Sequence, residues 1–294
     1  MIYPKISIVT PSYNQGQFLE DTILSVLGQR YPNLEYLIYD AASTDNSVEI
    51  IKKYEKELSY WVSEKDKGQG DAINKGFTRA TGEILMWLNS DDILLPNILN
   101  FVAAQYNEKG DGIYFGNCLH FEEKNNGALV ARGSNVEASF NSIPLELADT
   151  IIQPSSFWSR KIWLEMGILN IDFNFGFDWE WFLRAKQNNI PFYPLHKSIS
   201  LYRIHEEHKS GAGGRKRQEE LLRIYKLYNS RYANLYEHII NEDFTFSFGQ
   251  KITFRILKLI YGKGFRRTHF LRKIQSKKYK EYTAREIDII KSML

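Results

Sequence analysis

Two adjacent carboxylates and an amide follow a short apolar run. The run Gly82–Met86 is typical of a buried strand, and Trp87-Leu88-Asn89-Ser90-Asp91-Asp92 comes directly after it. Carboxylate oxygens suit hard divalent cations such as Mg²⁺ or Mn²⁺, which can bridge a protein to a diphosphate. An Asn/Asp helix cap on a solvated turn is the structural alternative, because short acidic turns are common.

A second candidate is Asp178, in the aromatic segment Phe177-Asp178-Trp179-Glu180. It stands at the start of a helix that we expect over residues 178 to 189, where the helix dipole favours a carboxylate. The local sequence favours this capping role. The catalytic alternative is a general base, because burial among aromatic rings raises the pKa of a carboxyl group.

His205 ends the strand-like run Ile199–His205. A lone histidine is usually structural or simply exposed. Residues 206 to 217 then contain three glycines and mostly polar or charged side chains. Such a segment is typical of a lid over a ligand site or of a linker, and both interpretations stay open.

The elements that must position these residues follow from the apolar periodicity. Strands are expected at 5–10, 34–39, 59–63 and 83–88, and helices at 18–29, from about 46 with Asn46 and Glu49 in a capping-box relation, and at 70–79. Strands alternating with helices predict a parallel sheet covered on both faces. Ligands bind such sheets at the carboxyl ends of the strands. One crevice should therefore collect Thr10, Pro11, Tyr13, Asp40, Asn89, Asp91 and Asp92.

The second half of the chain predicts a mixed, partly antiparallel arrangement. A helix is expected at 96–107, strands at 112–117, 119–122 and 128–132, an Asn-Gly hairpin turn at 123–127, an extended segment at 151–158 and a helix at 161–166. Residues 135–150 have no clear pattern.

Glycine-rich phosphate loops are missing from the sequence. Neither G-x-G-x-x-G after the first strand nor G-x-x-x-x-G-K-[ST] occurs. A bound phosphate would therefore depend on a metal and carboxylates, which strengthens the case for the Asp91-Asp92 pair as a metal site.

Composition sets broad limits on the class of protein. The 294 residues suffice for one large domain, or for a domain with an appendage, and the net charge is +3. The single cysteine, Cys118, excludes an intrachain disulfide and a cysteine-based zinc site. No apolar run approaches the roughly 20 residues that cross a bilayer, and the N-terminus offers no signal peptide. We expect a cytoplasmic protein.

The C-terminal region, about 215 to 294, is expected to be helical. Lys251–Lys280 contains 11 Lys or Arg and no Asp or Glu, interleaved with large apolar residues. This pattern is typical of a surface that meets an anionic membrane, and nucleic acid is the rival partner. We prefer the membrane to nucleic acid because the apolar residues have helical spacing. Packing on the core with a basic outer face stays open.

Taken together, seven motifs in order over about residues 4 to 210 resemble family 2 glycosyltransferases, the inverting nucleotide-sugar enzymes of the GT-A fold. They are Ser7–Asn14, Tyr39–Asp45, Asp66–Gly76, Gly82–Asp92, Gln153–Trp158, Phe177–Glu180 and Tyr202–His205. The resemblance implies an α/β fold with a mostly parallel central sheet and flanking helices. It divides the chain into a GT-A domain at 1–210 and a helical, basic C-terminal region at 211–294.

The resemblance also implies roles for single residues. Thr10, Pro11, Tyr13, Asp40, Asp71 and Asn89 would bind the nucleotide-sugar, with Asp40 accepting a hydrogen bond from the base. Asp91 would hold a divalent metal, Mn²⁺ or Mg²⁺, with Asp92 assisting and His205 approaching it when the lid orders. Asp178 would be the catalytic base toward the acceptor hydroxyl.

Two positions depart from the family pattern. The first Asp of the family's D-x-D is Asn89, a neutral and weaker ligand, and the usual Glu-Asp pair is Phe177-Asp178. Inversion needs only one base, so the chemistry survives the second change.

We therefore predict a metal-dependent inverting hexosyltransferase. A UDP- or GDP-sugar would be the donor, and a saccharide or lipid-linked saccharide of a surface polysaccharide or glycolipid the acceptor. The enzyme would lie in the cytoplasm or on the inner face of the plasma membrane, where an anionic surface is a further candidate partner, and no nucleic acid is expected. A non-catalytic nucleotide-sugar-binding or partner-binding member of the fold is the alternative, and a nucleotidyltransferase is disfavoured because no triphosphate loop follows the first strand.

Overall fold

The computed structural model describes residues 2–123, 128–134, 136–205, 214–241, 248–261, 266–274 and 276–294. The chain forms two compact units. The sheet unit comprises Met1–Ser142 with Thr150–Ala212, and the helical unit comprises Ile143–Asp149 with Gly213–Leu294. The predicted boundary at residue 210 stays a prediction.

The sheet unit contains a nine-stranded sheet within the described residues, in the order β3-β2-β1-β4-β8-β6-β9-β5, with β7 paired to β6. The strands in chain order are β1 (Ile6–Ser12), β2 (Leu34–Asp40), β3 (Tyr60–Ser63), β4 (Ile84–Trp87), β5 (Ile93–Leu94), β6 (Ile113–Glu123), β7 (Leu129–Gly133), β8 (Ser156–Ser159) and β9 (Phe192–Arg203). The pairs among β1 to β4 are parallel, whereas β8 is antiparallel to both β4 and β6. The predicted mostly parallel central sheet is confirmed.

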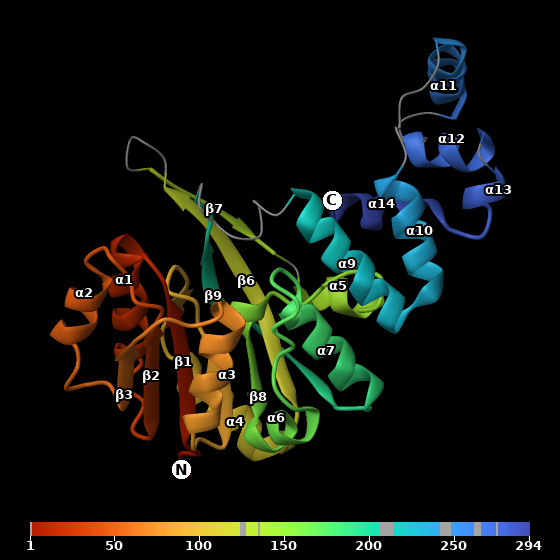
Figure 1. Cartoon of the computed structure of the whole chain (residues 1–294). Helices are drawn as coiled ribbons and strands as arrows, with labels where there is room; N and C mark the ends of the chain where they lie inside the picture. The colour runs from red at the N-terminus through yellow and green to blue at the C-terminus, as the bar shows by residue number, and fades with distance from the viewer. Residues whose placement is uncertain are drawn as a thin grey trace. The chain divides into compact units, whose positions relative to one another are not determined.

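Helices cover both faces of this sheet (Figure 1). They are α1 (Gly16–Leu27), α2 (Ser47–Lys53), α3 (Gln69–Arg79), α4 (Ile98–Lys109), α5 (Val136–Ser142), α6 (Arg160–Met166) and α7 (Phe177–Gln187). Buried apolar residues of α1, α2 and α4 form one core with Ile6, Ile8 and Met86 of the sheet. The alternation of side chains along a strand turns Val9 to the opposite face, where α3 packs.

An aromatic cluster fills the core on this opposite face. The rings of Trp87 and Trp158 lie 5.2 Å apart, those of Trp158 and Trp181 5.1 Å, and those of Phe77 and Trp163 4.7 Å. Gly76 brings α3 close to β1, because a Cβ there would lie 2.4 Å from Cγ1 of Val9. Aromatic side chains therefore pack tightly on the face of the sheet that carries α3, α6 and α7, near the carboxyl end of β4.

Several expected elements differ from those observed. The runs 112–117 and 119–122 form one strand, β6, whose register against β9 shifts around Asn117. Asn46 makes no side-chain cap on α2. Instead Asp45 accepts the Ser47 N–H at 3.0 Å. The hairpin residues 124–127 and the lid residues 206–213 lie outside the described residues, and 214–217 form the first turn of α9 (Gly214–Tyr228).

The helical unit contains α9, α10 (Ser230–Ile240), α11 (Phe248–Tyr261), α12 (Arg267–Ile274), α13 (Ser276–Tyr279) and α14 (Ala284–Ser292). Tyr225 and Tyr236 join α9 to α10 through rings 5.0 Å apart. Arg231 donates to both carboxylate oxygens of Glu286, at 2.6 and 3.1 Å, at the start of α14. Within the described ranges, no helix is both long and apolar enough to cross a membrane.

The buried carboxylate of Glu35 joins neighbouring segments at the amino end of the sheet by hydrogen bonds. It accepts hydrogen bonds from Lys5 Nζ at 2.8 Å, from the Thr81 N–H and hydroxyl at 2.7 Å each, and from the Ser7 hydroxyl. Burial alone would raise the pKa of Glu35, but these hydrogen bonds outweigh burial and lower the pKa to about 2. The ionised carboxylate therefore stabilises the fold.

We predict that Glu35 makes the sheet unit sensitive to acid. The pKa is lowered on folding, so this stabilisation is full above the ordinary value of 4.5 and is lost as the pH falls toward 2. At pH 7, Glu35→Gln should lower the free energy of unfolding by about 3 kcal/mol, and the difference from wild type should vanish in strong acid. Urea unfolding followed by tryptophan fluorescence reports on this unit, because all 6 tryptophans lie between Trp61 and Trp181.

The matched control for this prediction is Glu55→Gln, since Glu55 is exposed on the same unit. Its unfolding free energy should equal that of wild type at every pH. Equal stability of Glu35→Gln and wild type at pH 7 would show that the network contributes nothing.

Candidate active site

The carboxyl ends of β1, β2 and β3 meet at one edge of the sheet. Ser12 of β1 lies opposite Asp40 of β2, and Asp40 lies opposite Ser63 of β3. β4 lies on the other side of β1, with Trp87 opposite Val9. The strand register therefore brings the residues after β1, β2 and β4 to the same edge.

Asp40 is almost fully buried at this edge, with 2% of its surface exposed. Its carboxylate accepts the Ser43 N–H at 2.9 Å, the Ser43 hydroxyl at 2.5 Å and the Ser63 hydroxyl at 2.6 Å. These bonds fix the turn after β2 against β3. The predicted contact of Asp40 with a base stays a prediction.

The turns after β1 and β2 interlock. The Asn14 N–H donates to the Ser43 hydroxyl at 2.8 Å, and the Asn14 side-chain oxygen accepts the Thr44 N–H at 2.8 Å. Asp45 accepts the N–H of Gly16, the first residue of α1, at 2.8 Å. Residues of the first two sequence motifs thus hold the two turns together by hydrogen bonds.

Of the three residues predicted to lie in the turn after the first strand, Thr10 and Pro11 lie within β1, which extends to Ser12, and Tyr13 lies in the turn. The Thr10 hydroxyl is buried, 3.1 Å from the Tyr36 hydroxyl, and Pro11 is also buried. The Tyr13 side chain is exposed (61%). Among these three predicted nucleotide residues, Tyr13 alone presents a broad side-chain surface to solvent, and an aromatic ring can stack on a base.

Asn89 and Asp92 bond to each other in the turn after β4. Asn89 Nδ2 donates to Asp92 Oδ2 at 3.1 Å, and Asn89 Oδ1 accepts from Gln69 Nε2 at 2.7 Å. Asp92 is 1% exposed, and its Oδ1 accepts the Arg203 N–H at 3.4 Å. Burial and the neighbouring charge of Asp91 raise the pKa of Asp92. These contacts give Asp92 a role in shaping the turn, and its predicted help in metal binding stays a prediction.

Asp91, in contrast to Asp92, contacts His205. Asp91 Oδ2 lies 3.0 Å from His205 Nε2, and the two side chains are 20% and 12% exposed. The His205 ring packs against Phe18 of α1 at 4.7 Å. The structure thus brings together two predicted metal residues that are 114 positions apart. Among the described residues, no three His, Cys, Asp or Glu side chains group closely enough to hold a metal by themselves.

Arg203 is a positioning residue that the sequence analysis did not single out. Its guanidinium lies 4.7 Å from the ring centroids of both Phe18 and Phe121. Nε donates to the Asp91 carbonyl at 3.2 Å, and Nη2 pairs with Asp21 of α1 at 2.8 Å. One side chain thus ties the acidic turn to β9 and α1. A basic residue two positions before His205 was the only signal in the sequence.

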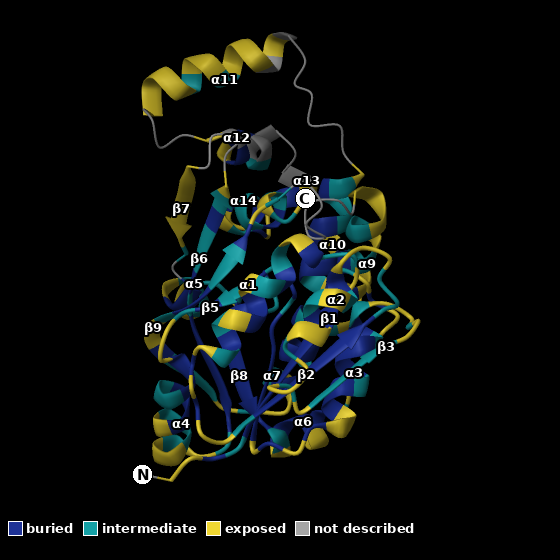
Figure 2. Cartoon of the chain, turned by 90° about the vertical axis from the view of Figure 1, so that its left-hand side faces the viewer, coloured by how far each residue is buried: buried dark blue, intermediate teal, exposed yellow. Residues whose placement is uncertain are grey.

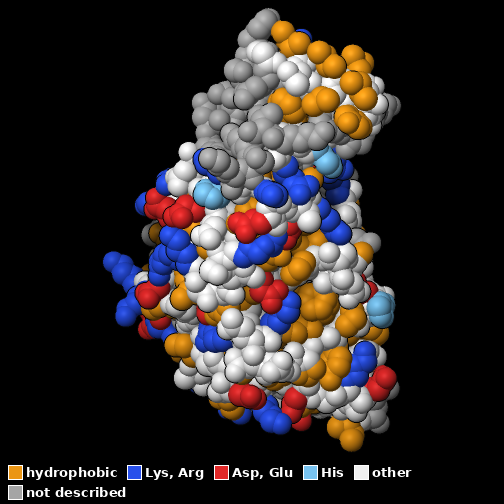
Figure 3. Space-filling view, turned by 90° about the vertical axis from the view of Figure 1, so that its right-hand side faces the viewer, with side chains coloured by type: hydrophobic (Ala, Val, Ile, Leu, Met, Phe, Trp, Pro, Cys, Tyr) orange, Lys and Arg blue, Asp and Glu red, His pale blue; other side chains and the backbone are white. Residues whose placement is uncertain are grey.

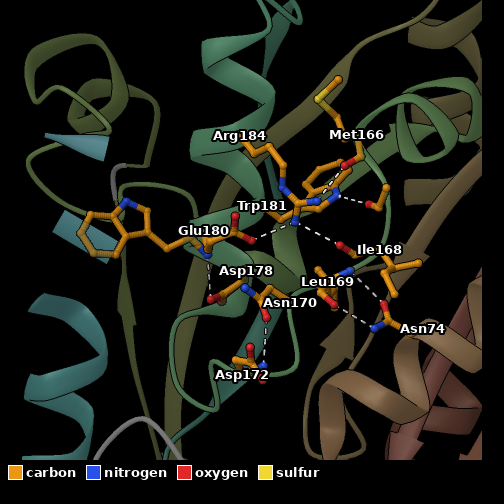
Figure 4. Close-up of polar contacts among 12 residues, drawn as sticks. Asn74, Met166, Ile168, Leu169, Asn170, Asp172, Asp178, Glu180, Trp181 and Arg184 are labelled. Carbon is orange, nitrogen blue, oxygen red and sulfur yellow. Dashed lines mark hydrogen bonds and ion pairs between the residues drawn. The ribbon is translucent and has the colours of Figure 1, made fainter. Parts of the chain in front are cut away.

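Asp178 lies in the first turn of α7, half-buried, and its Oδ1 accepts the Trp179 N–H at 2.9 Å (Figure 4). The preceding ring, Phe177, lies 6.1 Å from Trp87 at the end of β4. A Cβ on Gly70 of α3 would lie 3.9 Å from Phe177. The amino ends of α3 and α7 therefore meet close to the edge that carries the acidic turn.

The loop that precedes α7 is held by side chains from two helices (Figure 4). Arg184 donates to the carbonyls of Met166 and Ile168 at 2.7 and 3.0 Å, and it pairs with Glu180 at 2.8 Å. Asn74 of α3 exchanges two hydrogen bonds with the backbone of Leu169. This clamp, which the sequence analysis missed, fixes the backbone leading into α7 and Asp178.

Asp71 lies in the first turn of α3, and its side chain is 19% exposed. It accepts the Lys67 N–H at 3.1 Å and pairs with Lys75 at 3.3 Å. These contacts stay within α3 and its amino-terminal turn. The predicted nucleotide contact of Asp71 therefore stays a prediction.

The different environments of Asp91 and Asp92 predict different effects of their substitution on stability. Asp92→Ala should lower the free energy of unfolding by about 2 kcal/mol, because the Asn89 amide and the Arg203 N–H lose a buried acceptor. Asp91→Asn keeps the size of the side chain at a partly exposed position, so stability should stay within about 0.5 kcal/mol of wild type. Urea unfolding followed by tryptophan fluorescence compares them, and equal losses would contradict the assignment.

Comparisons with known proteins agree with this architecture. The putative teichuronic acid biosynthesis glycosyltransferase TuaG of Bacillus subtilis is 40% identical over 92 residues, which cover 30% of this chain and 36% of TuaG. The GalNAc(5)-diNAcBac-PP-undecaprenol beta-1,3-glucosyltransferase of Campylobacter jejuni is 28% identical over 221 residues, which cover 72% of this chain and 69% of that protein. The match to TuaG thus spans about a third of that relative's length.

Among solved structures, the mannosyltransferase PcManGT of Pyrobaculum calidifontis, in complex with GDP-Man and Mn²⁺, superposes with a TM-score of 0.61. The match covers 99% of this chain and 87% of that one, at 14% identity, and confirms the predicted GT-A fold. Residues 7–164 match the family described as Glycosyl transferase family 2. This match covers more than half of the sequence and includes β2 to β4, the turns after β1 and β2, and the Asp91-Asp92 pair, so the chain belongs to glycosyl transferase family 2.

Proposed function

We propose that this protein is a metal-dependent inverting hexosyltransferase that moves a sugar from a nucleotide-diphosphate sugar to a hydroxyl acceptor. The observation that carries the proposal is the Asp91–His205 pair, 3.0 Å apart, beside the carboxyl ends of parallel strands. Diphosphate ligands favour this edge in open α/β sheets. A cytoplasmic location belongs to the same proposal, and the buried thiol of Cys118 accords with it.

The donor would lie along this edge. Exposed Tyr13 offers a ring for stacking on the base, and Asp40 and Asp71 would serve the nucleotide as the family resemblance implies. The donor sugar and its nucleotide, UDP or GDP, stay open. PcManGT binds GDP-Man, which supports a nucleotide-sugar of this general chemistry.

The residues at the edge fit a divalent cation in part. Asp91 provides a carboxylate oxygen, the ligand type that Mn²⁺ and Mg²⁺ prefer, and His205 provides an imidazole nitrogen, which hard Mg²⁺ disfavours. The Asp92 oxygens already accept from Asn89 and Arg203. Oxygens of the diphosphate would complete the ligand set. Bound there, the cation would offset the negative charge of the leaving diphosphate.

The chain's own chemistry would be proton removal by Asp178. The acceptor hydroxyl oxygen forms a bond to the anomeric carbon while the bond from that carbon to the diphosphate oxygen breaks. The hydroxyl proton passes to the Asp178 carboxylate. A single displacement on the face opposite the leaving group inverts the anomeric configuration, so one base suffices. The Arg184 and Asn74 clamp would hold the acceptor side in position.

The acceptor is proposed from the relatives. The Bacillus subtilis relative is named for teichuronic acid biosynthesis, and the Campylobacter jejuni relative for a substrate joined to undecaprenol through a diphosphate. Their names support a saccharide or lipid-linked saccharide of a surface polymer or glycolipid as the acceptor class.

A non-catalytic, nucleotide-sugar-binding member of the fold is the second candidate. It is favoured by Asn89 in place of an acid, since this amide is engaged with Gln69 and Asp92. Both candidates bind a donor, but only an enzyme turns it over. Release of nucleoside diphosphate from a donor in the absence of acceptor therefore separates them.

Donor binding should stabilise the sheet unit only when metal is present. At a concentration one hundred times Kd, a bound ligand raises the free energy of unfolding by about 2.7 kcal/mol. We expect one nucleotide-sugar of a UDP- and GDP-sugar panel to raise the Tm with Mn²⁺ and to have little effect with a chelator. Asp91→Asn should abolish the Mn²⁺-dependent part, and Asp111→Asn, remote from the edge, should keep it. An increase in Tm on adding the donor that depends neither on metal nor on Asp91 would refute the metal role.

Removing the proposed base should slow turnover and leave donor binding intact. Asp178→Asn should lower kcat by about 10²- to 10⁴-fold, the usual contribution of a positioned base, with the donor KM unchanged. Glu165→Gln changes an exposed acid on α6 and serves as the control. Wild-type kcat in Asp178→Asn would show that another group takes the proton.

A further inference from the structure

Helix α11 carries a row of apolar side chains that no other part of the described structure covers. Its members recur at helical spacing, so they share one face of the helix. They are Ile252, Ile256, Leu259 and Ile260, with 42%, 51%, 85% and 68% of their surface exposed. Figure 2 draws α11 mostly in the colour of exposed residues, and Figure 3 shows hydrophobic side chains gathered on it. Isolated exposed apolar residues are common on proteins, but a contiguous row marks an interaction surface.

A row of cations runs beside this apolar row. Lys251, Arg255 and Lys258 each precede an apolar member by one residue, and all three are exposed. One residue turns an α-helix by about 100°, so the cationic row borders the apolar row along the length of the helix. The helix therefore has an apolar face with a positively charged edge.

The remaining side of α11 faces its own unit. Phe254 and Leu257 are half-buried, and the Phe254 ring lies 5.7 Å from the ring of Phe270 in α12. Phe270 is 2% exposed, and Tyr279 of α13 is fully buried. The basic segment Lys251–Lys280 thus divides into two parts. The aromatic residues of α12 and α13 pack inward, and α11 turns its isoleucines and Leu259 outward.

We propose that α11 is a membrane-docking helix that lies in the surface of an anionic lipid bilayer. Its apolar row would enter the boundary between headgroups and acyl chains, and its cationic row would meet lipid phosphates. The helix has 14 residues, hence a length of about 21 Å. This is shorter than the roughly 30 Å hydrocarbon core, so the helix would lie along the surface.

The charge pattern favours a membrane over the other occupants of such a face. From residue 244 to residue 280 the sequence contains no Asp or Glu. A second copy docked through the same face would bring two cationic rows together without intervening acids, which is unfavourable. Nucleic acid would engage the cations and leave the apolar row in water. An anionic bilayer uses both rows at once.

Flotation of the full-length protein with lipid vesicles tests the proposal. Vesicles of phosphatidylcholine and phosphatidylglycerol in equal amounts should carry the protein upward, and vesicles of phosphatidylcholine alone should carry much less. Leu259→Ser with Ile260→Ser should reduce the partition coefficient by about tenfold or more, because two exposed apolar side chains are lost. Lys251→Gln with Lys258→Gln should reduce it by about tenfold on the anionic vesicles.

Two matched controls keep the test specific. Leu227→Ser removes an exposed leucine (64%) from α9 of the same unit, and Lys56→Gln removes an exposed lysine from the sheet unit. Both variants should float like wild type. Circular dichroism melting should coincide for all variants, since every changed side chain is exposed.

A fluorescent label gives a readout that does not depend on flotation. Cys118 is the single cysteine and is fully buried, so a maleimide dye will react mainly with a cysteine introduced at Leu259→Cys. A dye that brightens in an apolar medium should shift to the blue when anionic vesicles are added. The same dye at Leu227→Cys should show no shift.

Three results would overturn the proposal. The first is equal flotation on neutral and anionic vesicles, or no flotation at all. The second is wild-type flotation of both α11 double variants. The third is a concentration-dependent dimer, or binding to single-stranded RNA, that the Leu259→Ser, Ile260→Ser variant loses while vesicles have no effect on the dye.

Discussion

The candidate active site depends on how the protein buries two polar side chains, those of Asp92 and Arg203, at one turn. The Asp92 carboxylate accepts from the Arg203 backbone, and the Thr22 hydroxyl donates to the Asp92 carbonyl at 2.8 Å. The Arg203 guanidinium, between two aromatic rings, pairs with Asp21. A buried polar group is tolerated when it is hydrogen-bonded, and a buried cation such as Arg203 when it is also paired. The hydrogen bonds of both side chains fix the turn against α1 and β9 and leave Asp91 as the acid that contacts His205.

The parallel half of the fold was predictable because its signals are local. Each of the first four strands is a short apolar run, and a helix with its own apolar face follows each of the first three, so the alternation predicts a covered parallel sheet. The antiparallel half was harder to predict because its strands find their partners far along the chain. The first part of β9 contains Pro194, Lys197 and His196, the last with a φ of 50°. No alternation of apolar residues marks it as a strand, and its pairing with β6 decides its structure.

The residues of the candidate site were easier to predict from the sequence than the contacts between them. Asp91 and His205 were both predicted to serve a metal, and the fold places them in contact. The different environment of Asp92 was not predictable from its neighbours, because it depends on Arg203, 111 residues away. Asn46 shows the same limit on a smaller scale. It has the residue type of a helix cap, but Asp45 bonds to the start of both α1 and α2, and nothing in the local sequence reveals this double role.

The interlocked turns after β1 and β2 have a consequence for binding energetics. Asn14, Ser43, Thr44 and Asp45 join the two turns by hydrogen bonds in both directions, so neither turn can shift without breaking bonds to the other. A ligand that settles against them meets a surface that is already ordered. The conformational entropy of these turns is lost during folding, so little of it remains to be lost on binding. Preorganisation of this kind lets a small ligand bind with few contacts, and it would make the two turns recognise their ligand as one rigid body.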